Sequence, residues 1–241
     1  MKFAIIAAGE GSRLSAAGVK VPKPLIEING EKLIDRLIRI FMSNDASEIV
    51  VICNDVTTQV SMHLAQLQKD GLKGHPLPLR FIVKSTPSSM HSLYEISKYL
   101  DKETFCLTTV DTVFDEEIFS CYLSCLRKLV SDGVADGVMG VTSFIDDEKP
   151  LYVDTDDDMN ITGFLDKQQN SKFVSGGIYG LTPKSITILQ KCIDNGESRM
   201  RNFQRALVAD RLNLKAFDMG RIMDIDRIED IRKAEIFMQG K

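Results

Sequence analysis

The sequence contains no tryptophan, three histidines and no apolar run long enough to cross a membrane. A membrane-spanning helix needs at least about 18 consecutive apolar residues, so we expect no membrane partner. Basic runs are missing as well, and the formal net charge is −4. Because nucleic-acid-binding proteins carry a basic patch or stripe, we also expect no nucleic-acid partner.

Cysteine pairs at metal-ligand spacing are absent too. The five cysteines include no Cys-x-x-Cys pair, and Cys121 and Cys125 lie four residues apart on a predicted helix. Two thiols do not make a zinc site, and the histidines lie in other segments, so we expect reduced thiols and no structural metal. The N-terminus enters a strand pattern without the regions that mark a signal peptide, which predicts a cytoplasmic protein.

No proline-rich or glycine- and serine-rich linker divides the 241 residues, and there is no internal repeat. A chain of this length can bury one large core, so we predict a single domain over residues 1–241. In the first 145 residues, apolar runs alternate with segments of helical periodicity. This alternation predicts right-handed βαβ units in an α/β, mostly parallel sheet flanked by helices. The predicted strands are 3–8, 49–53, 79–83, 104–109 and 137–142, and the predicted helices are 33–41, 56–67, 89–100 and 116–130.

The pattern changes between residues 146 and 182. Shorter apolar segments separated by polar turns predict an antiparallel excursion with strands at 151–154, 161–166 and 172–181. We interpret this excursion as a small substrate-binding subregion of the same domain. The rest of the chain predicts helices at 183–194, 201–210 and 228–238 and a strand at 214–218.

The first 25 residues are the most informative segment. An apolar run ends in Gly9-Glu10-Gly11-Ser12-Arg13, and nine residues later comes Pro22-Lys23-Pro24. Glycines let backbone N–H groups close around an anion. Arg13 adds a planar guanidinium suited to phosphate, and Lys23 adds an ammonium group on a segment stiffened by proline. We therefore predict a polyphosphate site.

The glycine turn has two other interpretations, a plain strand-to-helix turn and a dinucleotide-binding fingerprint. The fingerprint needs a third glycine at its sixth position, where this chain has Leu14. The complete pattern, Ala-Ala-Gly-x-Gly-Ser-Arg-Leu followed by Pro-Lys-Pro-Leu, resembles the sugar-nucleotidyltransferase family. The resemblance extends over nearly the whole chain and implies a Rossmann-like nucleotidyltransferase fold.

This resemblance implies a reaction in which a phosphorylated acceptor attacks the α-phosphorus of a nucleoside triphosphate and pyrophosphate leaves. The acceptor would be a sugar 1-phosphate, giving an NDP-sugar. Phosphocholine or another phosphorylated alcohol is an alternative acceptor, and a catalytically silent nucleotide-binding regulator is an alternative of another class. Arg13 and Lys23 would be the catalytic cations. The nucleotide-binding residues would be Ala8, Gly9, Gly11, Ser12, Arg13, Ser88 and Ser89.

Acidic residues would hold the Mg²⁺ cofactor of this reaction. Asp111 follows the strand 104–109, at the carboxyl edge where ligands of such sheets bind. Asp224 begins a segment that loosely matches the family's second metal motif. Mg²⁺ takes one or two carboxylates and shares phosphate oxygens of the substrate. The family implies Asp111 and Asp224 as ligands and leaves open whether Asp226 joins them.

Several of these positions have a structural alternative as helix caps. An acid after a strand often caps the next helix, and Asp115 can do so for the helix that follows it. Asp226 can cap the closing helix, with Glu229 at the capping-box spacing. Ser88 or Ser89 can cap the helix at 89–100, and the segment around them resembles the phosphocholine cytidylyltransferase branch.

On the acceptor side, the family often has an aromatic-x-Glu-Lys-Pro motif followed by a glycine-containing strand. This chain has Phe164-Leu165-Asp166-Lys167-Gln168 in that place, and Gly177 in the strand that follows. The resemblance implies that Lys167 holds the acceptor phosphate and that Asp166 and Gly177 bind the acceptor. A solvated hairpin lysine is the alternative for Lys167. The base, the acceptor and the formation of a homo-oligomer stay open.

Overall fold

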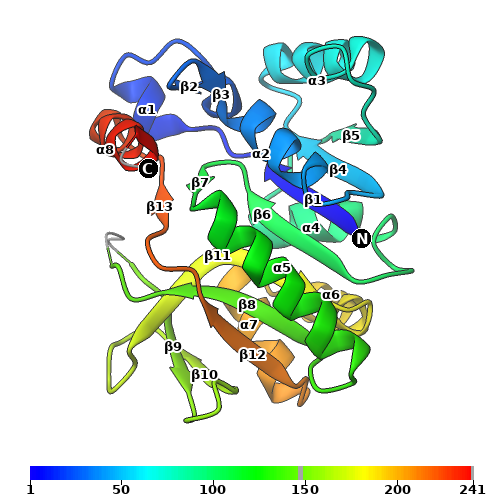
Figure 1. Cartoon of the computed structure of the whole chain (residues 1–241), viewed down its shortest axis with the longest axis vertical. Coiled ribbons are helices and arrows are strands. Elements are labelled where there is room, and N and C mark those ends of the chain that lie inside the picture. Colours follow the sequence, from blue (N-terminus) through cyan, green and yellow to red (C-terminus); the bar gives the residue numbers. More distant parts are fainter. Residues whose placement is uncertain (146–148, 240–241) are drawn as a thin grey trace.

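The computed structural model describes residues 1–145 and 149–239. Within these residues, one sheet of nine strands forms the centre of the molecule (Figure 1). Its strands are β1 (Lys2–Ala7), β4 (Glu48–Cys53), β5 (Leu79–Val83), β6 (Phe105–Thr109), β8 (Gly137–Thr142), β9 (Tyr152–Thr155), β10 (Ile161–Leu165), β11 (Phe173–Leu181) and β12 (Leu214–Asp218). The main path runs β10-β9-β11-β6-β1-β4-β5, and β8 pairs with β11 and β12.

Most strands of the sheet point in one direction. β1, β4, β5 and β6 are parallel to one another, and β8 is parallel to β12. β11 runs antiparallel to β6, β8 and β9, and β10 runs antiparallel to β9. These directions confirm the predicted mostly parallel α/β sheet with an antiparallel subregion. Residues 146–148 of that predicted subregion lie outside the described residues.

Helices cover both faces of the sheet. One face carries α2 (Leu33–Met42), α3 (Thr58–Asp70) and α5 (Glu116–Ser131), and the other carries α4 (Ser89–Ser97), α6 (Lys184–Asp194) and α7 (Met200–Ala209). Along β1, Phe3 and Ile5 are buried in the first core, while Ala4 and Ile6 are buried in the second. A strand buried on both faces is a continuous apolar run in sequence, which explains why β1 could be predicted.

Shorter elements surround the carboxyl edge of the sheet. They are α1 (Ser12–Ala16), the 3₁₀ helix η1 (Lys23–Leu25), β2 (Glu27–Ile28), β3 (Glu31–Lys32), β7 (Thr112–Val113) and β13 (Met223–Asp224). The closing helix α8 (Ile228–Gln239) lies next to β2, and in Figure 1 it is beside α1. β7 pairs with β13, and this pairing brings the last part of the chain back to the end of β6.

Two predicted caps are present at helix starts. The carboxylate of Asp115 accepts hydrogen bonds from the backbone N–H groups of Glu117 and Ile118 at 2.8 and 3.0 Å. The hydroxyl of Ser88 accepts one from the backbone of His91 at 3.4 Å. Such caps satisfy N–H groups that have no partner within the helix, so they fix where α5 and α4 begin.

Candidate active site

The glycine turn and Asp111 come together because they follow neighbouring strands. β1 and β6 are parallel, with Ile6 opposite Thr109, so both segments reach the carboxyl edge of the sheet. Gly11 has a φ of +60°, and a Cβ at this position would lie 3.2 Å from the Cβ of Lys23. Only glycine combines this left-handed backbone with such a close approach to Lys23.

A cavity of about 430 Å³ lies at this edge, between the glycine turn, the beginning of α4 and the end of β6. Among the described residues, Ser12 begins α1 without joining the wall, and Arg13 lines a neighbouring cleft. The structure therefore gathers most of the predicted nucleotide-binding residues around one cavity. Its walls include Ala8, Gly9, Gly11, Lys23, Ser88, Ser89 and Asp111.

Polar residues that the sequence analysis missed complete this cavity. Asn54 is 2% exposed, and its side-chain amide donates to the carbonyl of Ala8 at 3.2 Å. The same side chain accepts from the backbone of Thr57 at 2.8 Å, so it holds the glycine turn against the end of β4. The hydroxyls of Thr86 and Ser92 share a hydrogen bond of 2.6 Å at the beginning of α4. Asn54 follows a buried strand as Asp111 does, and that position was the available signal.

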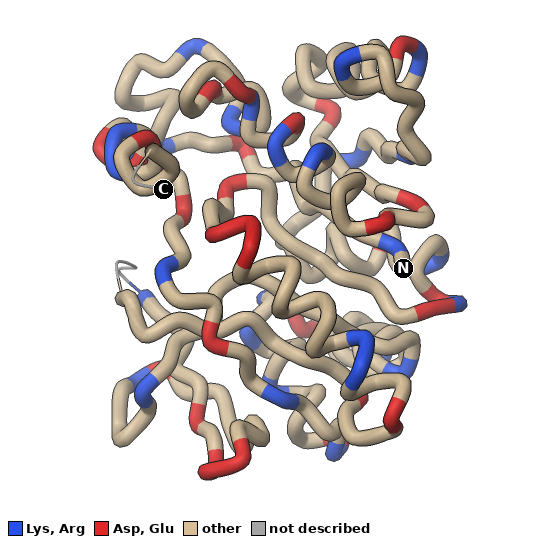
Figure 2. Tube along the Cα trace, viewed as in Figure 1, with Lys and Arg blue, Asp and Glu red and all other residues tan. Residues whose placement is uncertain are grey.

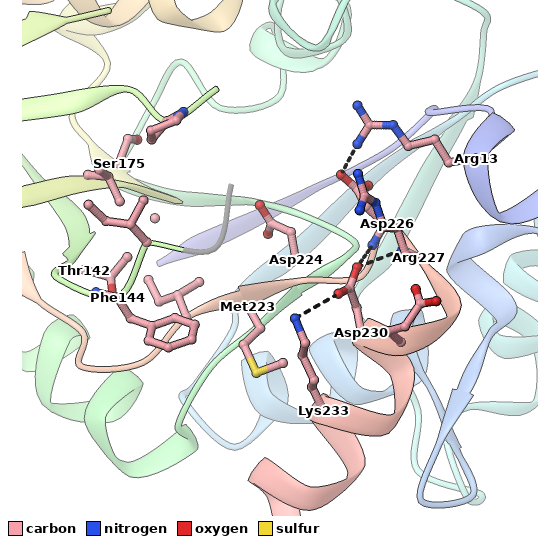
Figure 3. Close-up of a pocket in the computed structure, with 16 residues that line it drawn as sticks. Arg13, Thr142, Phe144, Ser175, Met223, Asp224, Asp226, Arg227, Asp230 and Lys233 are labelled. Carbon is pink, nitrogen blue, oxygen red and sulfur yellow. Dashed lines mark hydrogen bonds and ion pairs between the residues drawn. The ribbon is translucent and has the colours of Figure 1, made fainter. Parts of the chain in front are cut away.

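Lys23 lies between two carboxylates. Its ammonium group donates to Asp111 and, at 2.6 Å, to Asp226, and 10% of its side chain is exposed. Arg13 donates to the other carboxylate oxygen of Asp226 at 3.1 Å (Figure 3). Burial lowers the pKa of Lys23, but the charges of Asp111 and Asp226 outweigh it and raise the pKa above its ordinary value. Lys23 is thus a fixed cation at neutral pH.

The ion pairs with Lys23 and Arg13 also change how α8 begins. The predicted capping pair of Asp226 and Glu229 is wrong, because the carboxylate of Asp226 points to the two cations. Asp230 takes its place and accepts from the backbone N–H groups of Asp226 at 3.1 Å and Arg227 at 2.8 Å (Figure 3). Asp226 therefore remains free of a capping role and belongs to the charged cluster.

β13 places Asp224 beside the same cluster, opposite Thr112 of β7. The hydroxyl of Thr112 donates to Asp224 at 3.2 Å. Surrounding protein atoms and the like charges of Asp111 and Asp226 raise the pKa of Asp224 to about 7. The side chain is nevertheless exposed, because its open side faces the cleft (Figure 3). Three carboxylates and two cations therefore meet at one place.

Asp111 and Asp224 fit a divalent cation. A cation between like charges relieves the repulsion that raises the pKa of a carboxyl, and Mg²⁺ needs one or two carboxylates when a substrate supplies phosphate oxygens. Among the described residues, no group of three His, Cys, Asp or Glu side chains could hold a metal by itself. The arrangement suits an ion that takes some of its ligands from the protein and the others from a bound substrate.

A cleft of about 590 Å³ continues from Asp224 toward the antiparallel subregion. Phe144 and Ile145, which are 36% and 42% exposed, give it an apolar side. Gly177 has a φ of +72° at a bulge of β11, and a Cβ there would lie 3.2 Å from the hydroxyl of Thr112. Gly177 thus packs against the hydroxyl that positions Asp224.

The structure places Asp166 and Lys167 elsewhere, in a separate pocket of about 690 Å³. Arg205 and Arg201 form ion pairs with Asp166 and hold its pKa below the usual range. Of the described lining residues, only Pro150 belongs both to this pocket and to the cleft beside Asp224. Asp166 and Lys167 are therefore not brought to the Lys23 cluster, and their role toward the acceptor stays a prediction.

Further observations on the described chain concern its cysteines, its helices and the distribution of its charges. All five cysteines are free thiols, of which Cys53, Cys106 and Cys192 are buried. No described helix combines the length and the apolar character that crossing a membrane requires. Figure 2 shows acidic and basic residues interspersed along the trace.

Comparisons with known proteins agree with this geometry. The chain is 20% identical over 207 residues to a Bacillus subtilis (strain 168) protein named "Probable glucose-1-phosphate cytidylyltransferase", covering 79% of this chain and 78% of that protein. The fold of this chain is similar to that of the inositol-1-phosphate CTP transferase from T. maritima. The TM-score is 0.78 at 19% identity, and the match covers 99% of this chain and 94% of that chain. A UDP-glucose pyrophosphorylase complexed with UDP-glucose gives a TM-score of 0.80 at 15% identity, with coverage of 100% and 99%.

A family comparison covers more than half of the chain. Residues 3–140 match the model of the MobA-like NTP transferase domain, and the chain belongs to this family. The predicted membership in a nucleotidyltransferase family and the predicted fold are thereby confirmed.

Proposed function

We propose that this member of the MobA-like NTP transferase family transfers NMP from a nucleoside triphosphate to a phosphorylated small molecule, with release of pyrophosphate. The first candidate acceptor is a sugar 1-phosphate, which would give an NDP-sugar. The position of Lys23 supports this proposal most. One ammonium group lines the cavity at the glycine turn and contacts both Asp111 and Asp226, which is where a triphosphate would need a cation.

The residues of the site would act mainly by position and charge. Backbone N–H groups of the glycine turn would bind the triphosphate, and Lys23 and Arg13 would offset the negative charge that gathers on the leaving pyrophosphate. Asp111 and Asp224 would hold Mg²⁺, which stabilises such charge when it is bound. An acceptor phosphate monoester has a second pKa of about 6, so it is largely a dianion at neutral pH and needs no general base.

The acceptor has two candidates. The names of two of the similar proteins refer to glucose 1-phosphate or UDP-glucose. The name of the third refers to inositol 1-phosphate, a phosphorylated alcohol. Asp166 stands where the family has a glutamate, and it is engaged with Arg201 and Arg205 outside the cleft. A sugar hydroxyl in the cleft would then lack the carboxylate of Asp166 as a partner. This favours a phosphorylated alcohol as the second candidate, and phosphocholine is one such alcohol.

A matrix of substrates tests the proposal. Pyrophosphate release is measured for four nucleoside triphosphates against a panel of sugar phosphates and phosphorylated alcohols, with Mg²⁺ and with a chelator. Pyrimidine triphosphates come first, because the names of the similar proteins refer to cytidylyl, CTP and UDP compounds. We expect release with at least one pair and loss of release with the chelator. Triphosphate binding without release for any pair would indicate the silent regulator instead.

Three further expectations remain proposals. They are a single domain over residues 1–241, a cytoplasmic location and Mg²⁺ as the cofactor. Strands from both ends of the chain, β1 and β12, join one sheet, which supports the first of these.

A further inference from the structure

Arg36 is a charged residue on the buried face of α2. It is 2% exposed, and the other buried residues of this helix are apolar. Its guanidinium lies 3.6 Å from the carboxylate of Glu116, and no described group accepts a hydrogen bond from its Nε. Replacing a buried charge by an apolar side chain is often neutral or stabilising, and a buried N–H group without a partner costs free energy. The stability of the core therefore does not explain an arginine at this position.

The guanidinium group of Arg36 contacts Phe114 at two points. Its Nη2 donates to the backbone carbonyl of Phe114 at 2.6 Å, and its central carbon lies 5.2 Å from the centroid of the Phe114 ring. The ring is 1% exposed and stacks on Phe119, with 4.6 Å between the centroids. A hydrogen bond from a charged donor and a cation–π contact to the same residue hold its backbone in place. Arg36 thus connects α2 to the residue that follows β7 (Figure 1).

Phe114 ends a short segment, residues 110–114, that contacts both proposed metal ligands. The segment contains Asp111, whose backbone carbonyl accepts from the N–H of Ile225 at 3.1 Å. It also contains Thr112, which lies opposite Asp224 in the pairing of β7 with β13 and donates to its carboxylate at 3.2 Å. The position of this segment therefore determines how far apart the two carboxylates lie.

We infer that Arg36 is a positioning residue, which fixes the segment 110–114 and thereby the separation of Asp111 and Asp224. At its beginning, a backbone hydrogen bond of 3.0 Å joins this segment to β1, and at its end the guanidinium holds the carbonyl of Phe114. Mg²⁺ demands near-ideal octahedral geometry, so a small displacement of one carboxylate weakens the binding of the ion. The inference rests on the proposed function, which makes these two carboxylates ligands of Mg²⁺.

Amide hydrogen exchange, measured by NMR on the full chain, tests the position of the segment without any substrate, because it reports local opening. Arg36→Met keeps an unbranched apolar side chain in the core and removes the guanidinium group. The amide of Ile225, which donates to Asp111, should exchange about tenfold faster relative to the amides of β4, as the loss of one hydrogen bond to a charged group implies. An unchanged ratio of the two exchange rates would overturn the inference.

Arg39→Met is the matched control, one turn further along α2. Arg39 pairs with Glu31 and Glu116, each at 2.8 Å, and its described hydrogen bonds go to these two carboxylates. This variant should lower the midpoint of urea unfolding and leave the exchange ratio at Ile225 unchanged. Equal increases in Arg36→Met and Arg39→Met would show that Arg36 contributes only to overall stability, which contradicts a positioning role.

Arg36→Lys keeps the charge and provides the test if Arg36→Met does not fold. A lysine has a compact ammonium group in place of the planar guanidinium, so it cannot contact the carbonyl and the ring of Phe114 in the same way. Exchange at Ile225 should therefore remain faster than in wild type. A wild-type exchange ratio in Arg36→Lys would mean that the charge alone matters, and the inference would be wrong.

Metal affinity gives a second measurement. Mn²⁺ alone is titrated into each variant, and the electron paramagnetic resonance signal of the free ion gives its affinity. Arg36→Met should weaken this affinity about tenfold, the lower end of the loss seen when a group that orients a metal ligand is removed, and Arg39→Met should leave it unchanged. In steady-state kinetics, the Mg²⁺ concentration for half-maximal rate should rise by a similar factor in Arg36→Met, with the KM for the acceptor unchanged.

The outcomes separate this inference from the proposed function. If the wild type releases no pyrophosphate with any substrate pair, the proposed function is wrong, but faster exchange at Ile225 in Arg36→Met alone still supports Arg36 as the residue that fixes the segment. If the wild type is active and Arg36→Met keeps the wild-type exchange ratio, Mn²⁺ affinity and Mg²⁺ dependence, the inference is wrong and the proposed function stands.

Discussion

The ammonium group of Lys23 lies 2.6 Å from a carboxylate oxygen of Asp226, across 203 residues of sequence. The same ammonium contacts Asp111 after β6. Lys23 therefore connects η1, the end of β6 and the segment before α8 at one edge of the sheet. Phosphate oxygens can replace carboxylates as its partners, so the pairing suits a cation that must be in place before the triphosphate binds.

Lys23→Ala should lower kcat by at least about 100-fold, the order of loss seen when one group that stabilises transition-state charge is removed. Its cation matters most in the transition state, where charge gathers on the leaving pyrophosphate. The loss of stability, measured by the melting temperature, should be small, whereas the loss of rate should be large. The measurement is kcat at saturating concentrations of both substrates, together with thermal unfolding.

The matched control for this variant is Lys20→Ala, which removes an exposed lysine from the same loop. It should keep wild-type kcat. An unchanged turnover rate in Lys23→Ala would remove Lys23 from the mechanism.

Gly177→Ala should impair both folding and turnover. The left-handed φ of +72° is unfavourable for alanine, and the new Cβ would press on the hydroxyl of Thr112, which donates to Asp224. We expect a loss of about 1 kcal/mol or more in the free energy of unfolding and a lower kcat. Urea unfolding and steady-state kinetics measure the two effects.

Gly163→Ala provides the comparison in β10, which β9 separates from β11. A Cβ at Gly163 meets no atom within 4 Å, and its backbone is not left-handed. This variant should be close to wild type. Equal effects of the two substitutions would mean that the contact with Thr112 does not matter.

The sequence analysis located the strands and Asp111 because the signals are local. β6 is a short apolar run, and the residues that follow it necessarily reach the edge of the sheet. Parallel pairing of β1 with β6 then brings Asp111 to the glycine turn. Residue order and strand direction are enough to predict this part of the site.

The rest of the cluster depends on contacts between distant segments. β7 and β13 are two residues each, and their pairing joins Thr112 to Asp224. Strands this short show no periodicity in the sequence, so their pairing could not be predicted. Asp226 has a good capping position by sequence, but its carboxylate gains more from Lys23 and Arg13, so Asp230 caps α8 instead. Charges that meet only in the fold decide between such alternatives.

Asp136 should stabilise the fold in a pH-dependent way. It accepts from Lys184 at 2.7 Å and from the backbone of Asn213 at 3.0 Å. Burial raises the pKa of Asp136, but these two partners outweigh it and lower the pKa. A carboxyl whose pKa is lowered by folding stabilises the protein above its ordinary pKa, and this contribution is lost as pH falls through the lowered value.

Asp136→Asn should therefore cost about 1–2 kcal/mol of unfolding free energy at pH 7, and the difference from wild type should shrink below about pH 4. Urea unfolding between pH 3 and 7 measures it. Asp101→Asn changes an exposed carboxylate and should show no such difference. A gap between Asp136→Asn and wild type that stays constant down to pH 3 would contradict the charged role of Asp136.

Variants of the three carboxylates of the cluster should differ in how their rate of pyrophosphate release depends on Mg²⁺. Asp111→Asn and Asp224→Asn should each abolish most pyrophosphate release, because both remove a proposed ligand. Asp226→Asn should retain more activity, since it loses ion pairs with Lys23 and Arg13 but no proposed ligand. The measurement is the rate as a function of Mg²⁺ concentration for each variant.

Thermal unfolding with and without Mg²⁺ distinguishes metal binding from a structural role. A ligand that binds only the folded state stabilises it, so Mg²⁺ with triphosphate should raise the melting temperature of wild type and not that of Asp111→Asn or Asp224→Asn. With a chelator, Asp224→Asn should be at least as stable as wild type, because it removes a charge that Asp111 and Asp226 repel. If Asp224→Asn keeps the wild-type response to Mg²⁺, Asp224 is not a ligand. If Asp111→Asn unfolds yet keeps its activity per folded molecule, Asp111 acts in folding and the metal lies elsewhere.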